Sequence, residues 1–527
     1  MSTPSLVRSA RATGGSAATS TSWWRQTPRR YAAALPLHRC SCKGQQHRRI
    51  ATKSTLPPLF DLNDSRPGPQ KGDLAYLAMS GGVDSSVAAL LAIQQGLQPS
   101  PLFMRNWNDL DEGEAFEPGA GGKEGCSWLE DWKRVKRTCV ALGLKEEDAQ
   151  LIDLSTQYWL SVFAPALEVW QRGETPNPDV ACNREIKFGA LLDRVLCGSA
   201  SQSASGSFAV GEKAEYGRRP RKTWLVTGHY AGLIYSPDGY SAALRRARDK
   251  TKDQSYFLSS VSRSALSKVH LPLSQLEKSR VRELARKHRL PAAEQEESMG
   301  LCFVGTRRKQ PRQGDNHDLA RRMASRVHST KLQERAFASF ISSYLTPSPG
   351  PILSPDGTRL GSHAGLHTLT IGQRARLPGA KKAWFVSSKD VKTNSISVVA
   401  GQEHPALWAI SVNVGAITWH ASTQHKQISA QVRYRADAVP AKVTHDSDHI
   451  SDQSSPFGST CRVSFDRPIL AVAPGQVCAM YDGDAVVGSG IIRSVETFGS
   501  AAAASTMARQ EFHAHTAHGA ESPSSSA

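Results

Sequence analysis

The fold expected for this chain rests on the stretch LAYLAMSGGVDSS, residues 74–86. Its first part, Leu74–Met79, is a short apolar run of the kind that forms a buried parallel strand. After Ser80-Gly81-Gly82, the segment 87–91 places its apolar residues on one face of a helix, and the apolar run Pro101–Met104 completes a βαβ unit. Glycines between a strand and a helix let the backbone approach an anion while free helix N–H groups face it. The stretch therefore predicts a phosphate-binding loop.

The same rhythm continues along the first half of the chain. Apolar strands are expected at Leu151–Leu154 and Trp224–Thr227, with a helix from Tyr158 to Trp170 between them. Strands that alternate with helices favour an α/β fold with a doubly wound parallel sheet. From about Trp408 the pattern changes to short alternating segments, such as Ala430–Tyr434, separated by turns such as Pro474-Gly475, which predicts strands of a small β-barrel.

These changes of pattern give the expected domain boundaries. Two polar, basic stretches interrupt the structured part of the chain and are interpreted as insertions. The expected units are a presequence at 1–70, an α/β domain at 71–305 with a Ser-rich insertion at 198–222, a basic insertion at 306–335, a small central domain at 336–394, a β-barrel at 395–496 and a tail at 497–527.

The composition of the 527 residues indicates a globular protein with a polyanionic partner. Hydrophobic residues make up 39% of the chain, and no stretch reaches the roughly 20 consecutive apolar residues that a membrane span needs. The net charge of +18 favours nucleic acid, whose phosphates it would neutralise. The alternative is that basic tails raise the total, because the first sixty residues hold ten Lys or Arg and no acidic residue.

That acid-free N-terminal segment is rich in Arg, Ser, Thr and Ala, which is the composition of an organellar transit peptide. We expect the protein in the mitochondrial matrix; a chloroplast address and a plain basic tail are the alternatives. The nine cysteines are too scattered along the chain to form a disulfide scaffold. A cysteine with a role is therefore expected to have a chemical one.

The phosphate loop lacks the lysine with which G-x-x-x-x-G-K-[ST] loops hold a transferred γ-phosphate, which argues against a kinase or a motor. As SGGxDS, residues 80–85 resemble the PP-loop of ATP pyrophosphatases, which release pyrophosphate and leave AMP on their substrate. Adenylation turns a carbonyl oxygen into a group that a nucleophile can displace. ATP, with Mg²⁺ as its counter-ion, is the expected cosubstrate, and no protein-bound transition metal is expected.

Two cysteines stand in segments that favour such a nucleophile. Cys182 follows the turn-forming loop that begins at Thr175 and precedes a helix that contains Lys187, and a helix N-terminus and a nearby cation both favour the thiolate. Cys302 lies in the apolar segment Gly300–Gly305. A lone cysteine is more often a buried core residue, so the motifs around each thiol decide the interpretation.

Those motifs together resemble the tRNA-specific 2-thiouridylases. The similarity spans about Leu74 to Ile492 apart from the two insertions, and it covers Asn177-Pro178-Asp179 with Cys182-Asn183 and Lys187-Phe188, Gly300–Gly305, Thr227–Ala231, Lys252–Leu258, Thr370–Arg374 and Val432–Arg435. The resemblance implies a PP-loop domain of the adenine nucleotide alpha hydrolase type, then a central domain that contacts tRNA, then the β-barrel.

The resemblance also implies roles for individual residues. Cys302 would carry the transferable sulfur as a persulfide, and Cys182 would release it by forming a transient disulfide with Cys302. Asp179 would act as general acid or base beside a flipped target base that Asn177 and Pro178 help to hold. ATP would contact Ala78, Met79, Ser80, Gly81, Gly82, Val83, Asp84, Ser85, Met104 and Gly228. tRNA would contact Lys252, Asp253, Gln254, Arg433 and Tyr434.

The implied activity is ATP-dependent thiolation of the wobble uridine in mitochondrial tRNAs for Lys, Glu and Gln, supplied by a sulfur donor such as a cysteine desulfurase or a relay protein. One alternative is a PP-loop enzyme that delivers ammonia or an amine, which needs no cysteine pair. Another is a tRNA-binding protein with an inactive PP-loop, which the intact Asp84 and both thiols disfavour. A zinc site is disfavoured because neither thiol has a Cys or His at ligand spacing. The sequence does not set the oligomeric state.

Overall fold

The computed structural model describes residues 68–107, 127–202, 222–295, 340–421, 423, 427–445 and 460–501. Nearly all of the expected presequence, the basic insertion at 306–335 and the segment with Cys302 lie outside these ranges. No helix within them is both long and apolar enough to cross a membrane.

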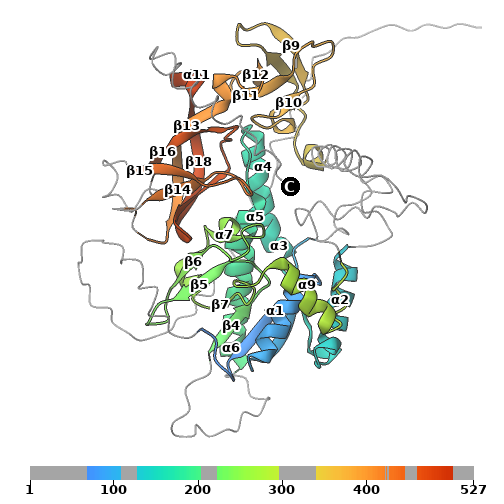
Figure 1. The fold of residues 1–527 in the computed structure, drawn as a ribbon. Coiled ribbons are helices and arrows are strands. Elements are labelled where there is room, and N and C mark those ends of the chain that lie inside the picture. Colours follow the sequence, from blue (N-terminus) through green and yellow to red (C-terminus); the bar gives the residue numbers. More distant parts are fainter. Residues whose placement is uncertain are drawn as a thin grey trace, which may run out of the picture. The chain divides into compact units, whose positions relative to one another are not determined.

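A five-stranded parallel sheet organises the first domain (Figure 1). Across the sheet, its strands are β3 (Gln150–Asp153), β2 (Gln98–Arg105), β1 (Leu74–Ala78), β4 (Thr223–Val226) and β7 (Val269–His270). The strand order reverses at β1, so the C-terminal ends of β1 and β4 form the switch point at which open α/β sheets bind ligands. This arrangement confirms the expected doubly wound parallel sheet.

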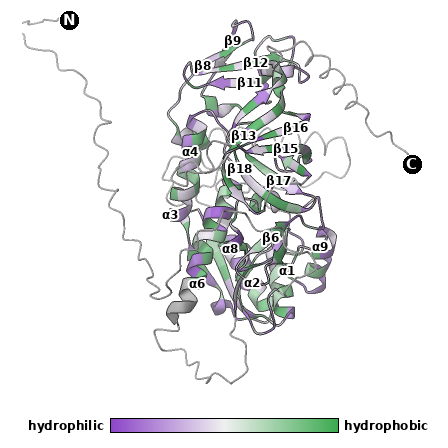
Figure 2. Ribbon diagram, turned by 90° about the vertical axis from the view of Figure 1, so that its left-hand side faces the viewer, coloured by the Kyte–Doolittle hydropathy of each residue, from purple (hydrophilic) through white to green (hydrophobic). Residues whose placement is uncertain are grey.

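Both faces of β1 are covered, which explains why its sequence is apolar throughout. Ala75 and Leu77 lie in one hydrophobic core, whereas Tyr76 and Ala78 pack against another. The first core also contains side chains from α1 (Val83–Gln94), α2 (Ser127–Ala141) and α9 (Lys278–Lys287). The second contains side chains from α6 (Leu191–Gln202) and from the helical segments between β3 and α6. Figure 2 shows the apolar residues of α1 and the polar residues of α9.

The helix expected from Tyr158 to Trp170 consists of three consecutive pieces. They are α3 (Ser155–Tyr158), a π-helical stretch η4 (Trp159–Phe163) and α4 (Ala164–Gln171). A second π-helix, η5 (Cys182–Ala190), follows α5 (Pro178–Ala181). Pattern analysis did not predict these π segments, because apolar spacing alone does not separate i→i+4 from i→i+5 bonding. Such segments are frequent at functional sites, and Cys182 opens one of them.

The central domain is a second sheet. In order, it contains β10 (Arg374–Ala375), β11 (Trp384–Asp390), β12 (Ser395–Ala400), β8 (Gly350–Leu353) and β9 (Arg359–His363). The boundary expected between residues 394 and 395 falls inside the β11–β12 hairpin, so the central domain extends to about Ala400. The sequence did not separate the two β units here because both consist of short strands.

The C-terminal domain is a closed six-stranded antiparallel barrel, as expected. Its strands are β13 (Trp408–Trp419), β16 (Cys461–Leu470), β15 (Val439–His445), β14 (Ile428–Gln431), β17 (Val477–Asp482) and β18 (Ala485–Thr497), and β18 pairs with β13 to close it. A hairpin of the first domain, β5 (Gly232–Tyr235) and β6 (Ala242–Arg245), joins this sheet through Arg245 opposite Ala485. The remaining short helical elements are η3 (Glu146–Asp148), α7 (Ser255–Leu258), α8 (Arg263–Leu266), η6 (Leu366–Thr368), η7 (Pro405–Leu407) and α11 (Phe498–Ala501).

Candidate active site

The phosphate loop connects β1 to α1 and is held in shape by its own side chains. Gly81 has φ +76°, a conformation that favours glycine, and Gly82 precedes the first turn of α1. The Ser80 backbone N–H donates to Ser85 Oγ at 3.1 Å, and the Ser85 hydroxyl donates to the Gly82 carbonyl at 3.1 Å. Gly82 offers no side chain to cap the helix. The first-turn N–H groups of α1 are thus arranged as an anion site.

Gly228 lies directly against this helix N-terminus, across the switch point. A Cβ atom on Gly228 would stand 2.6 Å from the Ser85 backbone nitrogen and 2.7 Å from the Asp84 carbonyl carbon. Only glycine allows the segment after β4 to approach so closely. Met104, near the C-terminal end of β2, belongs to the same edge of the sheet. The structure therefore brings together the three separate segments that were expected to contact ATP.

Asp84, in the first turn of α1, has two partners that sequence analysis did not identify. Lys278 Nζ donates to both carboxylate oxygens of Asp84 at 2.7 Å, and the Tyr230 hydroxyl donates to Asp84 Oδ1 at 2.8 Å. Both partners come from distant parts of the chain. A lysine in a basic helix and a tyrosine two residues after Gly228 carry no local signal of such a contact, so only the tertiary structure reveals it.

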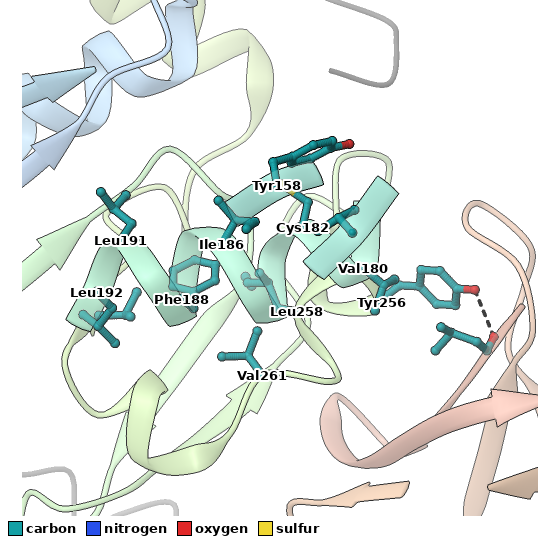
Figure 3. Close-up of a cluster of buried hydrophobic side chains, with 14 of the residues drawn as sticks. Tyr158, Val180, Cys182, Ile186, Phe188, Leu191, Leu192, Tyr256, Leu258 and Val261 are labelled. Carbon is teal, nitrogen blue, oxygen red and sulfur yellow. Dashed lines mark hydrogen bonds between the residues drawn. The ribbon is translucent and has the colours of Figure 1, made fainter. Parts of the chain in front are cut away.

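The loop with the expected target-base residues folds into the short helix α5. Asn177 caps this helix by accepting a hydrogen bond from the Val180 backbone N–H at 3.2 Å, and the Asn183 side-chain amide donates to the Asp179 carbonyl at 2.9 Å. Cys182 follows at the start of η5 and is only 3% exposed. Figure 3 shows its side chain near Val180, Tyr158 and Ile186.

Asn106 is a further residue at this thiol that sequence analysis missed. Its side-chain amide donates to Cys182 Sγ at 3.8 Å, and its own Oδ1 is a buried acceptor that has no hydrogen-bond partner among the described residues. Asn106 follows Met104 by two residues, at the end of β2. The Cys182 thiol therefore lies next to the edge of the sheet where β1, β2 and β4 end and where nucleotide is expected to bind, the nucleotide edge.

Burial shifts the pKa values of two groups near Lys187, the Asp179 carboxyl and the His229 ring. Desolvation raises the pKa of the Asp179 carboxyl, and the nearby Lys187 ammonium opposes that shift. Desolvation also lowers the pKa of His229 well below its usual value, and Lys187 adds to the effect. His229 Nδ1 lies 2.8 Å from Thr227 Oγ1, and its ring centroid is 5.5 Å from that of Phe188. A carboxyl with a raised pKa is suited to move a proton near neutral pH.

We expect Asp179→Asn to lose activity and gain stability at the same time. Because the pKa of Asp179 is raised in the folded state, the folded chain binds the proton more tightly than the unfolded chain, so this group favours folding less as pH rises above the ordinary value of 3.8. The variant should unfold at a higher temperature than wild type at pH 8, with the difference shrinking towards pH 4. Catalytic activity should fall about 100-fold. A stability difference that grows on acidification would contradict this assignment.

A turn of the barrel holds the loop that precedes α5. Gln476 Nε2 donates to the carbonyl oxygens of Thr175 and Pro176 at 3.0 Å each, and Asn177 Nδ2 donates to Gln476 Oε1 at 3.3 Å. The Thr175 backbone N–H donates to the Pro474 carbonyl at 2.9 Å. Tyr256 also reaches this turn, through a 2.9 Å bond to the Val477 carbonyl that Figure 3 shows. Gln476 is therefore a positioning residue for the target-base loop.

Gln476→Leu should lower kcat about 10-fold or more, because the loss of these bonds leaves the expected reacting groups misplaced, while the Kd for ATP stays unchanged. Steady-state kinetics and calorimetry measure the two quantities. Gln402→Leu, at an exposed position next to the barrel, is the matched control and should behave as wild type. Equal activity of the two variants would show that the turn does not position the loop.

The residues expected to contact tRNA come from two segments that the structure brings together. The Tyr434 ring lies 4.3 Å from that of Phe257 in α7, directly after Lys252–Gln254. Arg433 is exposed, but it lies in the turn between β14 and β15 and not on a strand as expected. β14 ends at Gln431, and the turn that follows it includes Arg435 with φ +63°.

In the segment Lys252–Gln254, two side chains already take part in hydrogen bonds within the protein. Asp253 is 8% exposed, and its carboxylate accepts hydrogen bonds from Arg246, Ser255 and the Ala247 backbone. The Gln254 side chain accepts a hydrogen bond from the Tyr230 backbone N–H. Lys252, the basic residue of this segment, is half-buried.

The other cysteines have buried surroundings where the structure describes them. Burial raises the pKa of the Cys139 thiol to about 11 and also raises that of Cys478. Cys461 is buried in the barrel core. Cys302, and with it the expected transient disulfide, lies outside the described residues. Within the described ranges, no group of three or more His, Cys, Asp or Glu is placed to hold a metal ion.

Comparison with known proteins gives matches along most of the chain. Three family models match in succession: the tRNA methyl transferase HUP domain at residues 75–306, the tRNA methyl transferase PRC-barrel domain at 338–400 and the Aminomethyltransferase beta-barrel domain at 411–492. The bacterial tRNA-specific 2-thiouridylase MnmA of Ralstonia nicotianae is 35% identical over 434 residues, which cover 81% of this chain and 97% of that protein.

A second relative has a similar extent of match. The tRNA-specific 2-thiouridylase MnmA of Cupriavidus metallidurans is 34% identical over 431 residues, covering 80% of this chain and 99% of that protein. Among solved structures, the NMN synthetase of Francisella tularensis aligns with 44% of this chain and 67% of its own at 18% identity, with a TM-score of 0.22.

Proposed function

Because the chain belongs to the tRNA-specific 2-thiouridylase family, we propose that it adenylates the 2-oxygen of a tRNA wobble uridine with ATP and replaces that oxygen with sulfur from a cysteine persulfide. Membership of this family establishes that the chain is a tRNA sulfurtransferase with a nucleotide-binding PP-loop. The further steps are our proposal.

One observation supports it most strongly: residues at the nucleotide edge of the sheet also touch the segment that carries Cys182. Asn106, two residues after Met104, donates to Cys182 Sγ. His229, next to Gly228, contacts the ring of Phe188 in η5. A base bound at Asn177–Asp179 would thus lie between the phosphate loop and the thiol. Adenylation and displacement at one carbon require this proximity.

In the first stage, the uridine 2-oxygen would attack the α-phosphorus of ATP. The bond to the β-phosphate breaks, pyrophosphate leaves, and the N3 proton of the uridine passes to a base, for which the raised pKa of Asp179 is suitable. The phosphate loop fits this task, because Gly228 approaches the first turn of α1 closely and places no side chain of its own against it. Residues 79–85 would hold the phosphates, with Mg²⁺ as their counter-ion.

In the second stage, the terminal sulfur of the Cys302 persulfide would attack C2 of the uridine, and AMP leaves. Cys182 Sγ then attacks Cys302 Sγ, the bond from Cys302 to the transferred sulfur breaks, and its electron pair completes the C2=S double bond as N3 takes its proton back from the base that removed it. The products are 2-thiouridine and a Cys182–Cys302 disulfide. A two-electron thiol reductant and a sulfur donor, such as a cysteine desulfurase or a relay protein, would restore the persulfide.

We further propose that the substrates are the mitochondrial tRNAs for Lys, Glu and Gln and that the site of action is the matrix. The support is the acid-free, Arg- and Ser-rich composition of residues 1–60. A fusion of residues 1–70 to a fluorescent protein should enter mitochondria. Entry into another organelle, or a diffuse signal, would contradict the assignment.

The test of the reaction is reconstitution with unmodified tRNA for Lys, ATP labelled in the α-phosphate and a sulfide source. One AMP should form for each 2-thiouridine, and a tRNA with cytidine at the wobble position should yield neither product. Formation of AMP with incorporation of ammonia in place of sulfur would instead identify an amidating PP-loop enzyme.

A further inference from the structure

The phosphate loop contains an acidic residue and no cation of its own. Asp84 lies in the first turn of α1, at the helix terminus where phosphate would bind. A carboxylate beside a polyphosphate is repulsive unless a cation neutralises it. The loop 79–86 contains no lysine or arginine, so a cationic side chain that acts here beside Mg²⁺ must come from another part of the chain.

Lys278 provides that cation. Its Nζ lies 2.7 Å from both Asp84 oxygens and 5.8 Å from the centroid of the Tyr230 ring, whose hydroxyl also bonds Asp84. The Lys278 side chain is 11% exposed and that of Asp84 is 32% exposed. The Lys278 backbone N–H donates to Asp249 Oδ2 at 2.9 Å. Lys278 is therefore fixed at both its backbone and its ammonium group.

The stability of α9 does not explain this placement. Lys278 is the first residue of α9, and that first turn contains no acidic residue. A cation at a helix N-terminus opposes the helix dipole, and an immobilised lysine loses side-chain entropy of about 1.5–2 kcal/mol. Both effects lower the stability of α9. The ion pair with Asp84 at the phosphate loop instead explains why a lysine occupies position 278.

We infer that Lys278 is a nucleotide-binding residue whose ammonium is shared between Asp84 and the polyphosphate of ATP. The inference rests on the proposed ATP-dependent activity and assigns the cation that the loop lacks. A group 2.7 Å from Asp84 stands beside any phosphate bound at the N-terminus of α1. The Lys278 ammonium would strengthen the binding of the phosphates of ATP and would not contact the adenine or the ribose.

Calorimetry of the full chain without tRNA tests this with two probes, ATP and adenosine. Lys278→Met keeps the aliphatic stem and removes the charge, so the Kd for ATP should rise about 10- to 100-fold, whereas the Kd for adenosine stays within about twofold. Lys278→Arg should restore part of the ATP affinity. Lys287→Met, at the exposed end of the same helix, is the control and should bind both probes as wild type does.

A second pair of variants covers the case in which Lys278→Met destabilises the fold by leaving Asp84 unpaired. Asp84→Asn and the double variant Asp84→Asn with Lys278→Met both lack that unpaired carboxylate. The double variant should bind ATP more weakly than Asp84→Asn alone. Unchanged ATP affinity, or an equal loss for ATP and adenosine, would overturn the inference. A wild-type chain that binds no ATP would instead overturn the proposed function.

Discussion

Cys182→Ser and Cys302→Ser should each lower the formation of 2-thiouridine about 1,000-fold or more, because a serine hydroxyl carries no transferable sulfur and is a poor nucleophile at neutral pH. Adenylation uses no thiol, so both variants should still release pyrophosphate and place AMP on the tRNA. Mass spectrometry of the digested tRNA measures thiolation, and labelled ATP measures adenylation.

The two variants differ in what else they should show. With Cys302 intact, Cys182→Ser should accumulate a persulfide when it is incubated with the sulfur donor in the absence of tRNA, which mass spectrometry detects, whereas Cys302→Ser should not. Cys139→Ala is the control, since Cys139 is fully buried away from the loop and burial raises its pKa to about 11. Thiolation that persists in Cys182→Ser would show that another group releases the sulfur.

Gly228→Val should abolish measurable ATP binding. Its Cβ would stand 2.6 Å from the Ser85 nitrogen and 2.9 Å from Ser85 Cα, and both are backbone atoms of a packed helix that cannot yield as a flexible side chain would. Displacing the first turn of α1 would misalign the N–H groups of the anion site, at an expected loss of about 100-fold or more in ATP affinity.

The matched control is Gly232→Ala in strand β5. A Cβ at Gly232 would have its nearest neighbour, the Cβ of Arg245, at 3.4 Å, so this variant should bind ATP as wild type does. Both proteins should be compared by calorimetry and by thermal unfolding. Normal ATP affinity in Gly228→Val would show that nucleotide does not bind at the switch point.

The sequence by itself determined the features that are local. In residues 74–86 a run of apolar residues, two adjacent glycines and a helical pattern predict strand, loop and helix, and the structure has β1, the loop and α1 in these positions. The alternating strands of the C-terminal part predict the barrel for the same reason: burial on one face imposes a period of two. The thiol and carboxyl of the target-base loop were identified by a motif of contiguous residues.

Some local expectations were wrong because a period does not encode backbone conformation. The alternation of β14 suggested a strand through Tyr434, yet the positive φ of Arg435 makes this segment a turn. The split of the helix from Ser155 to Gln171 into α and π pieces was also invisible, since both kinds of helix bury similar faces.

Only the tertiary structure decided which polar groups meet. Lys278 reaches Asp84 across 194 positions of sequence, Asn106 reaches Cys182 across 76, and Gln476 reaches Thr175 across 301. Each contact depends on strand order at the switch point or on the position of a barrel turn. A polar residue has no periodicity of its own, and its partner is set by the packing of elements far apart in the chain. The sequence therefore determined the fold and indicated the expected reacting groups, and the tertiary packing determined which residues contact them.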